Sequence, residues 1–131
     1  MDIVSALFIE NFQLRPVPGP STRVDITGAM FSLPAPSQPP VTLTPHLIVL
    51  VRSRRSDPSN GVLEVVFRDE EGGQVARNVS PFNIEPGKFT YRLVRAELEF
   101  AGFGTIEAHC RLVPSEQTTV VPLTLLPPVT A

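Results

Sequence analysis

The sequence lacks several features that would assign it to a functional class at once. Its 131 residues include one cysteine and no tryptophan, and the 11 lysine and arginine residues nearly balance the 13 acidic ones. A single cysteine excludes an internal disulfide, a four-cysteine metal cluster and a CxxC redox pair. A net charge of −2 provides no basic field for nucleic acid. We therefore expect no cofactor held by cysteines and no nucleic-acid partner.

Long hydrophobic runs are missing as well. The N-terminal apolar run covers only residues 3–9, and it is flanked by Asp2 and Glu10 rather than by basic residues. A secretory signal needs a basic start and a longer apolar stretch, and a membrane helix needs about 20 apolar residues. The sequence therefore predicts a cytoplasmic protein with no membrane partner.

Apolar residues are plentiful, but prolines divide them into short stretches. Hydrophobic residues make up 42% of the chain and charged residues 18%, which is enough apolar area for one folded domain over residues 1–131. The 15 prolines leave only residues 59–80 and 87–113 as proline-free stretches of more than 20 residues. Because proline breaks helix interiors, long helices are excluded from most of the chain.

The stretches between prolines are short, alternating and rich in β-branched residues, which is typical of strands. We expect strands at about residues 3–14, 22–33, 46–52, 62–69, 74–80, 89–100, 105–113 and 120–126. Seven or eight such strands predict an all-β fold, an antiparallel β-sandwich with immunoglobulin-like or C2-like topology. The predicted core comprises Leu7, Ile26, Leu47, Val49, Leu63, Val65, Phe67, Tyr91, Leu93, Ile106 and Leu112.

Several positions carry local expectations. Gly28 inside a strand predicts a β-bulge or a close backbone approach. Asn60 and Gly61 predict a tight turn with positive φ that joins residues 46–52 to residues 62–69. The apolar alternation of residues 89–100 changes phase midway, which fits a β-bulge or a short helix, and the aromatic residues favour a strand. Pro122 predicts an edge position for the last strand.

The order of these elements resembles a known family. An N-terminal strand is followed by residues 26–29 (ITGA), a proline-rich connection and an apolar strand, and then by residues 67–72 (FRDEEG) and 100–104 (FAGFG). This order is similar to that of a family of small uncharacterised bacterial proteins predicted to be single β-sandwiches. The resemblance implies the fold, and it implies no activity and no site residues.

Two groups of residues invite a chemical interpretation. His109 and Cys110 are adjacent, so a strand places them on opposite faces, where they form no catalytic dyad. Asp69, Glu70 and Glu71 offer carboxylates for calcium, with Asp57 in another loop, but a solvated turn is the simpler interpretation. His46 begins an apolar strand and is expected at its surface end. We therefore expect no enzyme, no catalytic residue and no metal site.

Arg52, Arg54 and Arg55 form a small basic cluster with no aromatic residue close by in the sequence. Binding to nucleic acid combines such charges with aromatic platforms, so the cluster does not indicate it. Two interpretations remain open. The arginines pair with Glu64 or Asp69 across the expected hairpin, or they dock on a protein or a phosphate.

The first and third predicted strands are apolar on both faces, whereas a sandwich sheet usually leaves one face wet. Ile48 and Leu50, together with Val4, Ala6 and Phe8, lack an obvious cover. The sequence thus predicts a non-catalytic interaction or assembly module, which forms a homodimer or larger assembly or docks on a partner protein. The predicted interface residues are Phe8, Ile48, Leu50, Arg52, Arg54 and Arg55.

Two alternatives to an interaction module remain. A carrier would hold a small apolar ligand between the sheets, with Tyr91 and His109 as polar anchors. A small hydrolase or metal enzyme would need His109, or the turn of residues 69–71, to lie in a cleft. The position of these side chains decides between the three classes.

Overall fold

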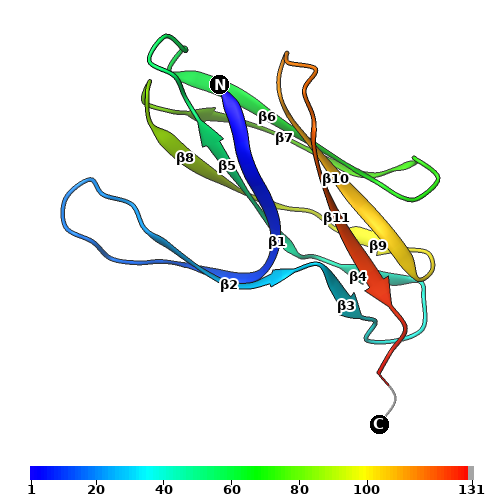
Figure 1. Ribbon diagram of the computed structural model, residues 1–131. Helices are drawn as coiled ribbons and strands as arrows, with labels where there is room; N and C mark the ends of the chain where they lie inside the picture. The colour runs from blue at the N-terminus through cyan, green and yellow to red at the C-terminus, as the bar shows by residue number, and fades with distance from the viewer. Residues whose placement is uncertain (130–131) are drawn as a thin grey trace.

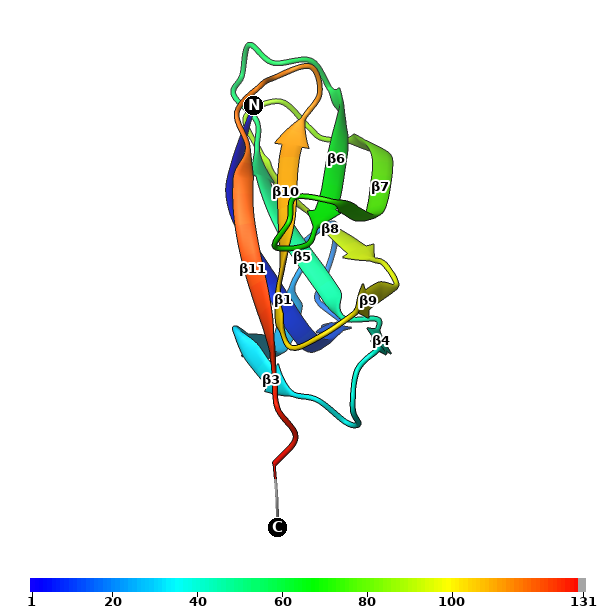
Figure 2. The ribbon, with the colours of Figure 1, turned by 90° about the vertical axis from the view of Figure 1, so that its right-hand side faces the viewer.

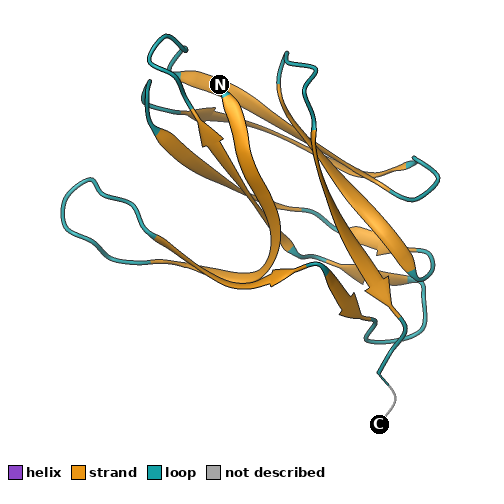
Figure 3. Ribbon diagram, viewed as in Figure 1, coloured by secondary structure: helices purple, strands orange, loops and turns teal. Residues whose placement is uncertain are grey.

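Strands make up the regular structure of residues 1–129, the part of the chain that the computed structural model describes (Figure 3). These residues contain no helix long and apolar enough to cross a membrane. The all-β prediction is confirmed. The strands are β1 (Asp2–Leu14), β2 (Val24–Met30), β3 (Ser32–Pro34), β4 (Val41–Leu43), β5 (His46–Arg52), β6 (Asn60–Arg68), β7 (Gln74–Asn83), β8 (Phe89–Arg95), β9 (Leu98–Phe100), β10 (Gly104–Leu112) and β11 (Thr119–Leu126).

Two sheets form the layers of a sandwich (Figure 1). The four-stranded sheet has the order β2-β1-β5-β8, and the five-stranded sheet has the order β3-β11-β10-β6-β7. A third, two-stranded sheet pairs β4 with β9. Figure 2 shows β11, β10 and β6 in front of β1 and β5. Neighbouring strands are antiparallel except β3 and β11, which are parallel.

The structure has eleven strands where the sequence predicted seven or eight. The expected strand at 22–33 is interrupted at Phe31, and its two parts belong to different sheets. The expected strand at 89–100 is interrupted at Ala96 and Glu97, where the chain leaves the four-stranded sheet and continues as β9. The phase change in this segment is therefore a change of sheet, and the short-helix alternative is wrong. The sequence analysis also missed β4, which lies in a proline-rich segment.

The inner faces of the two sheets form the core. Its members include most of those predicted: Leu47, Val49, Leu63, Val65, Phe67, Ile106 and Leu112, each at most 8% exposed. The rings of Phe8 and Phe67 meet across the sandwich with centroids 6.4 Å apart. The two sheets are thus joined by side chains from both inner faces.

Four predicted core residues lie elsewhere. A bulge in β1 between Ile3 and Ser5 shifts the alternation, so Ala6 and Phe8 face the core and Leu7 faces the other side of the sheet. In β8 the core residue is Val94, which places Tyr91 and Leu93 on the opposite face. Ile26 is 43% exposed. The prediction failed at Leu7 because one extra residue reverses the faces of β1. It failed in β8 and β2, which pair without a shift, because their outer faces also carry apolar residues.

Gly28 lies neither in a bulge nor at a close approach of another backbone; the atoms nearest to it belong to the side chain of Glu10. Ile9 pairs with Ala29 and Asn11 pairs with Thr27, so the register is the same on both sides of the glycine. The φ of Gly28 is +65°, and a Cβ at this position would lie 2.6 Å from Cδ of Glu10. The last strand is not an edge strand, because β11 lies between β3 and β10. Pro122 is accommodated there because the pairing with β3 begins only at Thr124.

Asn60 and Gly61 do not form the expected hairpin. The chain passes here from β5 in one sheet to β6 in the other, and both residues belong to β6. Gly61 is not among the glycines with positive φ. It is small for a different reason, since a Cβ would lie 2.7 Å from Cζ of the buried Phe82.

The close approach of Gly61 to Phe82 leads to a prediction about stability. We expect Gly61→Ala to lower the free energy of unfolding by about 1–3 kcal/mol, because the added methyl group overpacks the Phe82 ring. In a Phe82→Leu background the same substitution should cost less. Gly72→Ala is the matched control, because no atom lies within 4 Å of its Cβ position and its cost arises from a φ of +82°. Urea denaturation measures all four variants, and an equal cost of Gly61→Ala in both backgrounds would contradict the interpretation.

Candidate functional site

The two outer faces of the sandwich differ in chemistry. On the five-stranded sheet, Glu64 of β6 lies between Arg77 of β7 and Arg111 of β10, and each arginine has a nitrogen 2.6 Å from a Glu64 oxygen. The hydrogen bonds from Arg111 and then Arg77 hold the pKa of Glu64 below its usual value. This face is the charged, solvated surface that an antiparallel sheet normally presents.

The outer face of the four-stranded sheet is apolar. In β5 the side chains of His46, Ile48, Leu50 and Arg52 alternate with the core residues of the same strand. Ile48 pairs with Leu7 of β1 and Leu93 of β8, so three aliphatic side chains lie abreast across three strands. Ile48 is 2% exposed although it lies outside the main core cluster.

An apolar groove of about 340 Å³ lies on this face. Its lining consists of Thr22, Val24, Ile26, Ile48, Leu50, Phe89, Thr90 and Tyr91. Even-numbered residues of β2 form one wall, β5 contributes the floor, and β8 contributes the other wall. Figure 1 shows the hairpin between β1 and β2 projecting on the side of the molecule where β8 lies. Phe89 is 58% exposed and Ile26 is 43% exposed, so the walls present apolar surface to solvent.

The structure separates the six predicted interface residues. Ile48 and Leu50 line the groove, and Arg52 continues their row along β5. Phe8 is 1% exposed and lies in the core, because the bulge in β1 turns it inward. This corrects its expected place on the outer face. The sequence analysis missed the groove wall formed by Val24 and Ile26, although these residues alternate with the polar Asp25 and Thr27.

The arginine cluster has different partners from those expected. Arg52 and Arg54 each place a nitrogen near Oδ2 of Asp2, at 2.8 Å and 3.2 Å. The hydrogen bond from Arg52 is the largest cause that holds the pKa of Asp2 below its usual value. Pairing with Glu64 or Asp69 across a hairpin is wrong, because β5 and β6 belong to different sheets. Arg55 is exposed and packs beside Gly87.

The two expected ligand anchors do not share a cavity. Tyr91 lines the groove on the four-stranded sheet. His109 lies on the outer face of the five-stranded sheet, where its Nε2 is 3.3 Å from Oε1 of Glu107. The apolar space thus lies outside the sandwich rather than between its sheets. His46 packs its ring edge-on against Phe12, with centroids 5.2 Å apart.

His109 and Cys110 lie on opposite faces of β10, as predicted. Cys110 is fully buried in the core, and burial raises the pKa of its thiol to about 12. His109 is partly exposed on the other side of the strand. The thiol therefore has neither the base nor the low pKa that a nucleophile requires.

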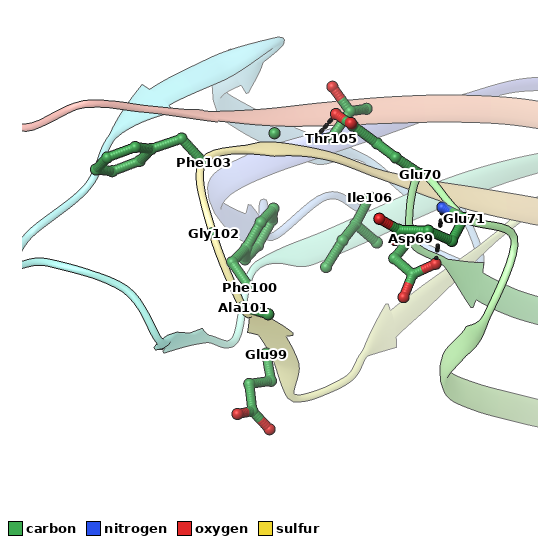
Figure 4. Close-up of a pocket in the computed structure, with 11 residues that line it drawn as sticks. Asp69, Glu70, Glu71, Glu99, Phe100, Ala101, Gly102, Phe103, Thr105 and Ile106 are labelled. Atoms are coloured by element: carbon green, nitrogen blue, oxygen red, sulfur yellow. Dashed lines mark hydrogen bonds between the residues drawn. The ribbon is translucent and has the colours of Figure 1, made fainter.

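The acidic turn between β6 and β7 borders a pocket of about 190 Å³ (Figure 4). Oδ1 of Asp69 accepts hydrogen bonds from the backbone N–H groups of Glu71 and Gly73, at 3.1 Å and 2.8 Å. Oε1 of Glu70 accepts one from Thr105 at 2.7 Å. Within residues 1–129 no three His, Cys, Asp or Glu side chains are grouped for a metal ion. Asp69 therefore stabilises the turn itself, and Glu70 connects the turn to β10.

Comparisons with known proteins give distant structural similarity and no family. No protein-family model matches the chain, and no curated protein does. Among solved structures, a family 123 glycoside hydrolase from Clostridium perfringens is similar, with a TM-score of 0.40 and 13% sequence identity. The match covers 79% of this chain and 24% of the hydrolase chain, so the chain spans about a quarter of that protein's length.

The burial of Cys110 makes a prediction about reactivity. At pH 8 we expect the native thiol to react with a disulfide reagent such as dithionitrobenzoate at least about a hundredfold more slowly than the thiol of the unfolded chain. The raised pKa keeps the thiol protonated, and the core packing keeps the reagent away from it. Absorbance of the released thiolate measures the rate with and without urea. Rapid stoichiometric reaction of the folded protein would contradict the placement of Cys110.

Proposed function

We propose that this chain is a non-catalytic protein-interaction module that docks through the outer face of its four-stranded sheet. The observation that supports this is the contrast between the outer faces. One face carries the Arg77–Glu64–Arg111 cluster, and the other carries aliphatic and aromatic side chains across β1, β5 and β8. An apolar sheet face is stable in water when another surface covers it.

The β1–β2 hairpin covers this face only in part. Val24 and Ile26 shield Ile48 and Leu50, but Phe89 and Ile26 still expose about half of their own side chains. Each apolar Å² removed from water contributes about 25 cal/mol, so a partner that buries these side chains gains most of its affinity there. Self-association and docking on another protein both follow from this surface. The immunoglobulin-like or C2-like strand order and the cytoplasmic location stay predictions of the sequence.

The exposed Phe89 provides the test. We expect the chain to self-associate at tens of micromolar, and we expect Phe89→Ser to weaken that association by about tenfold or more, because burial of a phenylalanine side chain contributes about 1.5–3 kcal/mol. Phe31→Ser is the matched control, since Phe31 is 74% exposed and does not line the groove. Sedimentation velocity measures both variants. A monomeric wild-type chain would contradict self-association, and equal effects of the two variants would contradict this location.

A second candidate function is the binding of a small apolar ligand in the groove. Its volume of about 340 Å³ lies within the range of about 300–1,000 Å³ that is typical of ligand sites. The lining combines apolar residues with the hydroxyl-bearing residues Thr22 and Tyr91. This is the composition that orients a mostly apolar ligand by a few polar contacts.

Tyr91 reports directly on this second candidate. It is the only tyrosine, and the chain has no tryptophan, so the intrinsic fluorescence arises at the groove. If the groove binds such a ligand, titration with decanol should change the emission saturably, and Phe89→Ser should weaken the effect while Phe31→Ser leaves it unchanged. A linear change or no change up to the solubility of decanol would contradict ligand binding.

A further inference from the structure

We infer that the open edge of β8 accepts an extended acidic segment of a partner protein, which is added to the four-stranded sheet as a further strand. The inference rests on the proposed interaction function and specifies the chemistry of the partner.

The backbone of β8 is suited to such an addition. β8 is the last strand of its sheet, and its seven residues pair one to one with β5 from Phe89 opposite Arg52 to Arg95 opposite His46. In an antiparallel pair every second residue directs its N–H and C=O groups away from the neighbouring strand. The free side of β8 therefore presents a row of unpaired donors and acceptors, which is a template for a new strand.

The other edges are less regular. β7 contains Pro81, and its pairing with β6 shifts register between Phe67 and Arg68. β2 contains Gly28 in a left-handed conformation, and β3 has only three residues. β8 contains neither proline nor glycine, and its pairing with β5 shows no shift. Among the edges of the two large sheets, β8 thus offers the most uniform ladder.

The charges along β8 specify the partner. Lys88, Arg92 and Arg95 recur along the edge, and none of them forms an ion pair within residues 1–129. Arg95 donates one hydrogen bond to the hydroxyl group of Thr44 at 3.2 Å, and the buried Nε of Arg92 has no hydrogen-bond partner. This edge is basic, although the net charge of the whole chain is −2. Carboxylates of an incoming strand would provide the missing partners.

Apolar side chains on the same strand specify the rest of the partner. Phe89, Tyr91 and Leu93 share the outer face, where an added strand would place every second side chain beside them. Lys88 and Arg92 share the other parity of the strand, whereas Arg95 lies on the outer face. A segment that alternates apolar and acidic residues therefore places its carboxylates beside Lys88 and Arg92. A second copy of β8 fits poorly, because antiparallel pairing centred on Arg92 would place two arginines directly opposite each other.

The test uses a blocked peptide of seven residues, the length of β8, in which valine and glutamate alternate. We expect saturable binding in the millimolar range or tighter, seen as a change in Tyr91 fluorescence and as slower hydrogen exchange of the outward amides of β8. A valine–lysine peptide should bind at least about tenfold more weakly, because it places cations beside Lys88 and Arg92. Methylation of alternate backbone nitrogens of the first peptide should abolish binding, because it removes the donors of the ladder.

Matched variants test the charges. Lys88→Gln with Arg92→Gln should weaken binding of the valine–glutamate peptide by about tenfold. Arg77→Gln with Arg111→Gln removes the same charge from the other sheet and should leave binding unchanged. Circular dichroism confirms that both double variants are folded.

Three results would overturn the inference. They are equal binding of the two peptides, undiminished binding of the methylated peptide, and no binding of the valine–glutamate peptide at millimolar concentration. Absence of binding would indicate that the arginines of β8 instead keep the edges of two copies of the chain apart. None of these results alters the sedimentation comparison of Phe89→Ser with Phe31→Ser, so failure of the inference and failure of the proposed function are distinguishable.

Discussion

The apolar character of both faces of β5 is the constraint on which the rest of the structure depends. Leu47, Val49 and Val51 fill the sandwich core, while Ile48 and Leu50 require a second cover on the other side of the same strand. Strand residues alternate between faces, so no placement of β5 buries both sets against the five-stranded sheet. The long β1–β2 hairpin provides part of this second cover, because Val24 and Ile26 of β2 line the same groove as Ile48 and Leu50.

The apolar surface that stays exposed coincides with the proposed interaction surface. The groove and the open edge both involve β8, whose odd-numbered residues line the outer face and whose arginines follow its length. An interaction through either surface would use the same strand, while the Glu64 cluster on the far sheet stays in solvent. The outer face of the four-stranded sheet is thus mainly apolar, and the outer face of the five-stranded sheet is charged.

The sequence predicted the fold class and the interiors of several strands, because alternation is a local property. Leu63, Val65 and Phe67 were assigned correctly, and so was Cys110. Features set by tertiary structure were not predicted. Nothing local indicates the bulge that turns Phe8 inward, or the change of sheet after β5. The phase change in residues 89–100 marked the change of sheet after β8 but did not distinguish it from a bulge or a helix. The groove floor was predicted as an uncovered surface, but its wall depends on how the β1–β2 hairpin bends.

The connection from β5 to β6 has a bearing on how the chain folds. Strands that follow each other in sequence here belong to opposite layers, and β5 pairs instead with β1 and β8, which lie far from it in the chain. Loop closure must precede these distant pairings, and β-sandwiches dominated by them fold in about milliseconds to seconds. During that interval the apolar residues of β8 lie open to other nascent chains. An apolar strand edge that is exposed before the fold is complete is a template for pairing with another chain, so the order in which β8 is covered matters for this protein.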